Sequence, residues 1–429
     1  MGKNSKWAVV FLVLGIVAIG ALPAQTQPAQ MQGDDLTIKI AVMGPGDPLY
    51  FWWGHIALVI DNARTGQSRF YDYGLFSFNK DNFYLNFAFG RLWYSCGVSS
   101  TENNINSYIY TNRDVVLYTL DISPEKREEV RQYAERSVLP ENRDYLYHHF
   151  KHNCGYPILD IIDLVTDGQF KEHFTAEPGR FTLRQHVRRH TWFSPIWDWL
   201  LNFWMGQDID TPLTVWDELF LPDEIGSRIS EFVYTDSNGV SRPLVSDVGM
   251  VYRSHNRLPV LDFPRRQWPR ELALSLFLAL ILGCLFHLQS KSTARGQVAL
   301  GMVHSLFGLV FGGAGLVLFF MSFFTSHDYT YHNANLLFAN PLLLAAVPLG
   351  IRYAVSRNYD TRLRSEFILR LLWLLVVLGI AASMLIKLLP QFWQQNLTDQ
   401  MLMLPIALTL ALEPAGLKRM IERIFWRWL

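Results

Sequence analysis

The sequence has little of what would place the chain among disulfide-bonded or nucleic-acid-binding proteins. It has only 3 cysteines in 429 residues, which is few for an exported protein. Its 38 basic and 38 acidic residues cancel, so no basic excess favours contact with nucleic-acid phosphates. Hydrophobic residues make up 50% of the chain, and long apolar runs follow residue 271. This excess indicates a membrane as the partner.

The first segment has the order of an export signal. Lys3 and Lys6 precede an almost continuous apolar stretch, 7–22, which is followed by Pro23 and small or polar residues. This order predicts a signal peptide or N-terminal anchor over 1–24. The segment has no cysteine for lipid attachment.

The last third of the chain is predicted to cross the membrane. Basic residues fall only in alternate loops, and the intervening loops 325–333 and 390–399 contain neither Lys nor Arg. The basic positions are Lys291 and Arg295, then Arg352, Arg357, Arg362 and Arg364, then Lys418, Arg419, Arg423 and Arg427. By the positive-inside rule the C-terminal tail is then cytoplasmic and residues 25–268 lie outside, followed by a membrane domain of about five helices over 269–429. The apolar runs are 271–289, 298–324, 334–350, 367–389 and 400–416.

The part between these two regions reads as α+β. Short runs rich in β-branched or alternating apolar residues predict an antiparallel sheet, and Ser123-Pro124 predicts the start of a helix. Asp236-Ser237-Asn238-Gly239 predicts a hairpin turn within 232–251. The aromatic stretch 192–205 suits either the membrane surface or a packed core. The expected strands are 36–42, 54–60, 69–73, 92–98 and 114–120.

Cys154 stands where a loop turns into a buried helix. Apolar residues recur after it at helical spacing, from Ile158 to Val165. Asn153 is a candidate N-cap, and Pro157 suits the first turn. The positive end of a helix favours a thiolate and could hold an oxyanion. Cys154 is therefore the candidate nucleophile.

A cysteine nucleophile needs a base, and His55 in the second expected strand is the best candidate. Asp72 on the next strand could orient its imidazole, provided that the register places both on one face. A strand histidine before a helix-start cysteine is the papain-type pair in permuted order. We therefore expect a permuted papain-like domain with Cys154, His55 and Asp72 as catalytic residues.

Two other interpretations of these residues stay open. Cys96 and Cys154 could form a disulfide in an oxidising compartment. His148, His149 and His152 could bind zinc, but no carboxylate or cysteine cluster joins them at ligand spacing, so they more simply form the rim of the site. No metal and no cofactor are expected.

At these residues the sequence resembles the Lnb-type lipoprotein N-acyltransferases of bacteria. The matching stretches lie in the same order along nearly the whole chain. They are Trp53-Gly54-His55, Tyr71-Asp72-Tyr73-Gly74, Asn153-Cys154, Trp216-Asp217-Glu218-Leu219-Phe220-Leu221-Pro222, and His327 through Asn333-Ala334-Asn335 to Asn340-Pro341.

The resemblance implies a periplasmic domain with the fold of NlpC-type peptidases and lecithin:retinol acyltransferases, held at the inner membrane. Cys154 would take an acyl chain from a phospholipid as a thioester and pass it to the α-amino group of a diacylglyceryl-cysteine lipoprotein, with His55 as base. A cell-wall amidase or peptidase of NlpC type and a noncatalytic membrane sensor are the alternatives. Asn335, Asn340 and Pro341 are expected to form a polar break in a helix, facing the outer leaflet.

Overall fold

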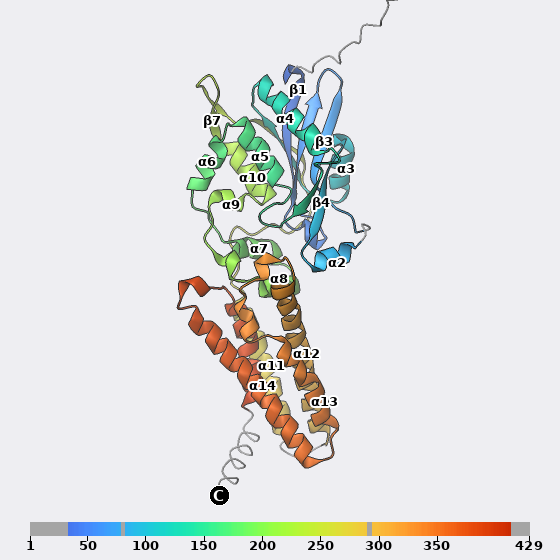
Figure 1. Cartoon of the computed structure of the whole chain (residues 1–429), viewed down its shortest axis with the longest axis vertical. Helices are drawn as coiled ribbons and strands as arrows, with labels where there is room; N and C mark the ends of the chain where they lie inside the picture. Colours follow the sequence, from blue (N-terminus) through green and yellow to red (C-terminus); the bar gives the residue numbers. More distant parts are fainter. Residues whose placement is uncertain (1–32, 79–81, 290–293, 413–429) are drawn as a thin grey trace, which may run out of the picture.

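The computed structural model describes residues 33–78, 82–289 and 294–412. Two predicted segments lie outside these residues. They are the signal peptide or anchor, 1–24, and the basic C-terminal tail. Figure 1 shows a sheet-containing part at one end of the molecule and a bundle of long helices at the other.

A seven-stranded sheet forms the centre of the first part, in the order β6-β4-β3-β2-β1-β5-β9. Every neighbouring pair in it is antiparallel. The antiparallel sheet and its five expected strands are confirmed. The strands are β1 (Leu36–Met43), β2 (His55–Asn62), β3 (Gln67–Leu75), β4 (Leu92–Ser100), β5 (Val115–Leu120), β6 (Asp144–Tyr147) and β9 (Val245–Tyr252).

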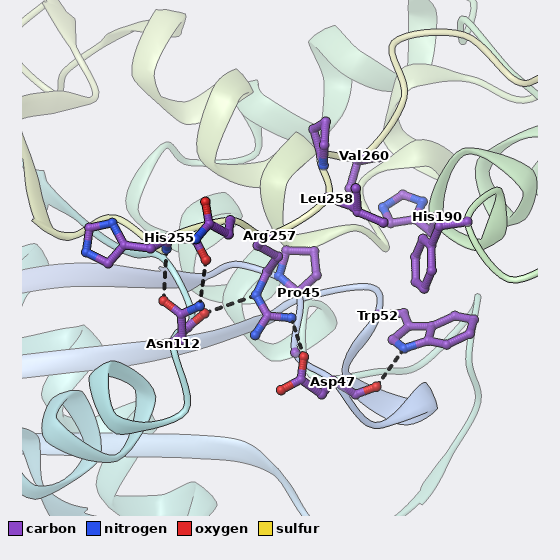
Figure 2. Close-up of a pocket in the computed structure, with 13 residues that line it drawn as sticks. Pro45, Asp47, Trp52, Asn112, His190, His255, Arg257, Leu258 and Val260 are labelled. Carbon is purple, nitrogen blue, oxygen red and sulfur yellow. Dashed lines mark hydrogen bonds and ion pairs between the residues drawn. The ribbon is translucent and has the colours of Figure 1, made fainter.

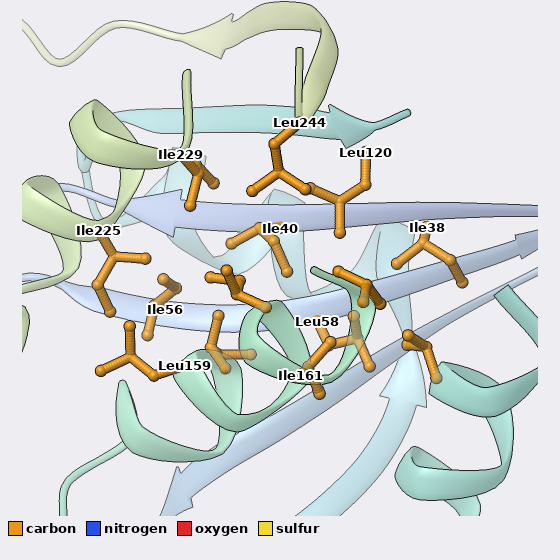
Figure 3. Close-up of a cluster of buried hydrophobic side chains, with 14 of the residues drawn as sticks. Ile38, Ile40, Ile56, Leu58, Leu120, Leu159, Ile161, Ile225, Ile229 and Leu244 are labelled. Atoms are coloured by element: carbon orange, nitrogen blue, oxygen red, sulfur yellow. The ribbon is translucent and has the colours of Figure 1, made fainter. Parts of the chain in front are cut away.

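Helices cover both faces of this sheet because its central strands are apolar on both sides. One face packs against α4 (Pro124–Ser137), α5 (Tyr156–Val165) and α10 (Pro222–Glu231), and the other against α3 (Thr101–Tyr110). Burying one such aliphatic side chain contributes about 1.5–3 kcal/mol. Figure 3 shows the first interface, where sheet residues Ile40 and Leu58 meet Leu159 and Ile161 of α5 and Ile225 of α10.

Two helix starts show how far local signals decide the structure. α4 begins as expected, with the Ser123 hydroxyl accepting a hydrogen bond from the Lys126 N–H. α5 begins at Tyr156 with Gly155 as N-cap, so the prediction of Asn153 as N-cap is wrong. The Asn153 side chain instead accepts a bond from the Gly155 N–H, 2.8 Å away, and forms a turn before the helix.

The predicted hairpin is confirmed as β7 (Val233–Thr235) and β8 (Ser241–Pro243), which pair antiparallel around the turn. The remaining helices of this part are short and lie along the edges of the sheet or below it. They are α2 (Phe83–Ala88), α6 (Gln169–Ala176), α7 (Leu183–Thr191), α8 (Pro195–Trp204) and α9 (Val215–Glu218).

Within the described residues, four helical stretches are long and apolar enough to cross a membrane. The expected fifth span appears as a shorter helix, α15, with Pro405 inside it, and the last residues of the expected run lie beyond residue 412. The helices are α11 (Trp268–Gln289), α12 (Ala294–Phe324), α13 (Ala346–Val355) with the 3₁₀ turns Ala334–Leu337 and Pro341–Ala345 before it, α14 (Tyr359–Ile386) and α15 (Leu397–Ala411).

The two loops without Lys or Arg both face the sheet domain. Asp328 of the first forms an ion pair with His148, with 2.7 Å between Oδ1 and Nε2. In the second, the Gln395 N–H donates to the Asp210 carboxylate. The arginine-bearing turn between α13 and α14 lies at the far end of the bundle (Figure 1). This arrangement agrees with the orientation expected from loop charge.

The end of α8 joins the two parts of the molecule. Phe203 is buried in the core of the helical bundle, and its carbonyl accepts bonds from the amide groups of Asn333 and Asn335. Arg184 donates to the carbonyls of Asn202 and Met205. The carbonyls at a helix end have no partner within the helix, so these side chains fix α8 to the bundle.

Two expectations are refined at this junction. The helix break after residue 333 is confirmed by two 3₁₀ turns, but Asn335 is fully buried and points into the protein rather than toward the outer leaflet. The aromatic stretch 192–205 packs in the core at Phe203, whereas Ile196 is 72% exposed and Trp197 is 42% exposed. Its contact with the membrane surface stays a prediction.

Candidate active site

The sheet register brings His55 and Asp72 together. His55 is the first residue of β2, and Asp72 lies on β3 opposite Ala57, two residues further along β2. Side chains two residues apart on a strand share a face, and the His55 Nε2 lies 3.0 Å from the Asp72 Oδ1. The same oxygen accepts a bond from the Gly74 N–H, at 2.7 Å. The register error that would have separated the two residues is therefore absent.

The His55 imidazolium and the Asp72 carboxylate stabilise each other's charge although both groups are buried. Burial alone lowers the pKa of His55, but the Asp72 carboxylate raises it, and the net result lies well above the ordinary value. Burial tends to raise the pKa of Asp72, yet the charge and hydrogen bond of His55 and the Gly74 N–H hold it below its usual range. Asp72 is thus a carboxylate that favours a protonated imidazole.

Gly74 places the imidazole beside Cys154. A Cβ on Gly74 would stand 3.3 Å from the His55 Nδ1 and 3.4 Å from the Cys154 Cβ. Both groups therefore touch the same small space, which is open because residue 74 has no side chain. Since Nε2 bonds to Asp72, Nδ1 is the nitrogen on the side of Cys154. A carboxylate at Nε2 favours the tautomer in which Nδ1 is unprotonated and can accept a proton.

Asn153 holds the turn that presents Cys154. Its side-chain amide donates to the carbonyl of Phe220, at 2.8 Å, and to that of His149, while its oxygen binds the Gly155 N–H. Cys154 itself is 8% exposed and stands two residues before α5. The Gly155 N–H is occupied in this turn, so it is not the free oxyanion donor that a helix starting at Asn153 would have provided.

Aromatic side chains line the sheet edge next to this turn. The rings of Tyr94 on β4 and Tyr147 on β6 are stacked with their centroids 4.0 Å apart. The Tyr145 hydroxyl donates to the carbonyl of Tyr73, just before Gly74. After β6 the backbones of His148 and His152 pair with each other, and the turn of Cys154 follows directly after His152. The thiol therefore has an aromatic wall on one side.

Cys96 and Cys154 are both free thiols, so the disulfide interpretation is wrong. The Cys96 Sγ lies 3.5 Å from the Ser137 Oγ, and burial raises the pKa of Cys96 to about 11. A thiol with this pKa is almost entirely protonated near pH 7.

The three histidines before Cys154 have separate partners. His148 pairs with Asp328, and the His152 ring nitrogen Nδ1 lies 3.2 Å from the Leu146 carbonyl oxygen. His149 packs against Tyr147 and Tyr329, and burial lowers its pKa to about 4. Among the described residues no group of three His, Cys, Asp or Glu side chains is arranged to hold a metal ion.

A separate pocket opens between the β1–β2 loop and residues 255–260. Figure 2 shows its lining, where Arg257 reaches Asp47 at 2.9 Å and the carbonyl of Asn112 at 3.0 Å. Trp52 and His190 line another part of it. The residues that line this pocket include neither His55 nor Cys154, and its ionic groups pair with each other.

The sequence reasoning did not assign a role to Gly74 or to the tyrosines around Cys154. Glycine inside a strand indicates that another group approaches the backbone closely, so the end of Tyr71-Asp72-Tyr73-Gly74 carried a usable signal. Tyr94 and Tyr147 gave no comparable signal because aromatic residues are common in strands that only pack a core.

The fold and the site together define a membrane-bound protein whose α+β domain carries a cysteine–histidine–aspartate arrangement. Residues 24–189 match the Lnb N-terminal periplasmic domain, and residues 266–415 match the Lnb transmembrane domain. The chain therefore belongs to the Lnb family and is an inner-membrane protein with a periplasmic domain. Comparisons with curated proteins and with solved structures gave no significant match.

Proposed function

We propose that this protein is a lipoprotein N-acyltransferase that uses Cys154 as its nucleophile, His55 as base and Asp72 as the group that orients the base. The observation that carries the proposal is the shared space at Gly74, which the imidazole Nδ1 and the Cys154 side chain both border. The two Lnb domains support an acyltransferase over other thiol chemistry. The strand histidine before the helix-start cysteine supports a permuted papain-like fold.

The first half-reaction forms a thioester. His55 Nδ1 takes the proton of Cys154, and the thiolate attacks an ester carbonyl of a phospholipid. The tetrahedral intermediate collapses when the C–O bond to glycerol breaks and the imidazolium gives its proton to the leaving oxygen. Asp72 stabilises the imidazolium throughout, because its carboxylate holds Nε2–H. The products are a lysophospholipid and an acyl-cysteine.

The second half-reaction transfers the acyl chain to an amine. The α-amino group of a diacylglyceryl-cysteine lipoprotein attacks the thioester carbonyl, and His55 removes a proton from the nitrogen. Collapse of this intermediate breaks the C–S bond, and the imidazolium returns the proton to the thiolate. An amide forms and the enzyme regains its thiol. The reaction is balanced without a metal, a cofactor or an oxidant.

The membrane domain suits this pair of substrates. Both donor and acceptor keep acyl chains in the bilayer, so a catalytic domain fixed at its surface meets them at high local concentration. The hydrogen bonds from Asn333 and Asn335 to the Phe203 carbonyl hold the end of α8 against the helical bundle. A soluble cell-wall amidase would gain nothing from four apolar stretches long enough to cross the membrane.

The direct test is mass spectrometry of lipoprotein N-termini in cells that have this chain as their sole candidate N-acyltransferase. Wild-type protein should give triacylated N-termini, and Cys154→Ala should leave diacylated ones at the same protein level. Cys96→Ser is the matched control and should behave as wild type. Triacylated N-termini with Cys154→Ala would refute the proposal.

A further inference from the structure

Helix α2 exposes apolar side chains at the lower edge of the sheet domain. Tyr84 is 73% exposed, Leu85 57% and Phe87 50%. Three such residues on a helix of 6 residues form a small apolar patch rather than scattered surface positions. We call these three side chains the α2 patch.

Contacts between the α2 segment and the end of α12 place the α2 patch near the end of a predicted membrane span. The Phe89 carbonyl accepts a bond from the Ser326 N–H at 2.9 Å, and the Phe89 ring lies 5.6 Å from the ring of Phe320, near the end of α12. His327 Nε2 donates to the Phe87 carbonyl at 3.0 Å. α12 is one of the stretches able to cross the membrane, so α2 lies where the bilayer surface must be.

Gly90 makes this contact possible. Its φ is +74°, in the left-handed region that favours glycine, and a Cβ there would stand 2.8 Å from the backbone nitrogen of His327. The chain after α2 therefore lies directly on the loop that follows α12. Figure 1 shows α2 at the lower edge of the sheet domain, to the side of the end of the bundle that meets this domain. The exposed side chains of the α2 patch therefore lie at the level where α12 ends.

An aromatic row leads from α2 toward Cys154. Phe83 packs on Phe76 with ring centroids 6.4 Å apart, and Phe76 packs on Tyr94 at 5.1 Å. Tyr94 stacks on Tyr147, which belongs to the strand that leads into the turn of Cys154. This row is continuous from the exposed helix to the wall of the active site.

We propose that the α2 patch inserts into the outer leaflet of the bilayer and that the row Phe83, Phe76, Tyr94 and Tyr147 guides the donor acyl chain to Cys154. Aromatic and aliphatic side chains at the end of a membrane span favour this interfacial position. The row offers rings and no formal charge, which suits an acyl chain and not a polar peptide. The guiding role rests on the proposed function, whereas the insertion does not.

The insertion is tested by the depth of a fluorescent label on the full-length protein. The background is Cys154→Ser with Cys284→Ser, and the buried Cys96 stays in place. A nitrobenzoxadiazole label goes on Tyr84→Cys and, as control, on Val240→Cys, which is 49% exposed between β7 and β8 at the opposite end of the sheet domain. The proteins are placed in phosphatidylethanolamine–phosphatidylglycerol vesicles that contain a nitroxide on the acyl chain.

We expect the nitroxide to quench the label at residue 84 several-fold more than the label at residue 240. Equal quenching at both positions would overturn the insertion. A blue-shifted emission at residue 84 without quenching by the nitroxide would also overturn it, because a protein surface and not lipid would then cover the α2 patch.

The guiding role is tested by transfer from two donors. The double variant Phe76→Ser with Phe83→Ser should transfer from bilayer phospholipid about tenfold more slowly, because the row then lacks the rings that lie between the α2 patch and Tyr94. Its reaction with a soluble short-chain thioester should match that of Val240→Ser. Equal losses with both donors would overturn the guiding role. Transfer from neither donor by the wild type would instead refute the proposed function, and the labelling result would still decide the insertion.

Discussion

Cys154 and Cys96 lie in the same hydrophobic cluster and are similarly buried, at 8% and 6% exposure, yet their neighbours differ. Cys154 shares the space at Gly74 with an imidazole whose other nitrogen binds a carboxylate. Cys96 has the hydroxyl of Ser137 at 3.5 Å, and burial raises its pKa to about 11. Burial alone therefore makes a thiol inert, and a base at the right place is what distinguishes a nucleophile.

The largest expected effect comes from removing one thiol at a time. Cys154→Ala should abolish acyl transfer, because no other group can form the thioester. Cys96→Ser should keep nearly full activity, since the hydrogen-bond partner of its Sγ is the Ser137 hydroxyl and not a base. Purified variants in vesicles with a lipoprotein acceptor provide the measurement. Similar losses in both would remove the distinction between the two cysteines.

Alkylation compares the two thiols without any substrate. In Cys284→Ser protein, iodoacetamide at pH 7 should modify Cys154 at least about a hundredfold faster than Cys96, because a thiol of pKa about 11 is only about one part in 10⁴ thiolate at that pH. His55→Ala should slow the reaction of Cys154 and leave Cys96 unchanged. Peptide mapping gives both rates, and faster labelling of Cys96 would contradict the account.

Two glycines offer a matched pair of backbone tests. In Gly74→Ala the new Cβ would stand 2.7 Å from the His55 Cε1, so the imidazole must move away from Cys154. We expect a loss of about a hundredfold in transfer, since a small misplacement of reacting groups is costly. In Gly97→Ala, next to Cys96, the Cβ meets only the end of the half-exposed Leu75 side chain, which can rotate away.

Gly97→Ala should therefore stay close to wild type in activity. Circular dichroism and thermal unfolding of both glycine variants show whether either is misfolded. A fully active Gly74→Ala would mean that His55 and Cys154 need not meet at this point.

Asp72→Asn isolates the charge behind the base. A single oxygen, Oδ1, binds both His55 and Gly74, so an asparagine can keep both contacts and lose only the charge. We expect transfer to fall by about tenfold, because general acid–base catalysis depends on the pKa of the base. The rate should be measured against pH, and the imidazole pKa should fall in the variant. An unchanged profile would exclude a role for the carboxylate.

The smallest expected effect is a change of stability with pH. The folded-state pKa of His55 is raised, so its protonation stabilises the fold fully below the unfolded value of about 6.5 and is lost as pH rises through the folded value. The pKa of Asp72 is lowered, so its contribution is present above its unfolded value and is lost as pH falls through the folded value.

Wild type should therefore exceed Asp72→Asn in thermal midpoint by about 2–4 °C near pH 5.5 to 6. The difference should shrink at higher pH, as the imidazole loses its proton, and in strong acid. A difference that grows toward high pH would show that the two groups do not stabilise each other.

The sequence predicted those parts of the fold that depend on local patterns. The alternation in β1, the cap at Ser123 and the turn at Asn238-Gly239 all act over a few residues, and all are confirmed. The contact of His55 with Asp72 followed from one assumption about register, which the pairing of Ala57 with Asp72 satisfies.

The expectations that failed depended on contacts between distant residues. Asn153 is not an N-cap because its amide reaches Phe220, 67 residues later, and its oxygen closes a turn on Gly155. Asn335 points inward because the end of α8 needs partners for its carbonyls. No periodic pattern records either contact. The α2 patch was missed because six residues are too few to show a helical period.

The most direct test of the account is the covalent state of Cys154 when the amine acceptor is left out. Full-length protein in phospholipid vesicles should gain the mass of one acyl chain on the peptide that contains Cys154, and neutral hydroxylamine should release it, as expected for a thioester. His55→Ala should not accumulate this species. An acyl chain on Cys96, or undiminished N-acylation without any acyl group on Cys154, would contradict the account.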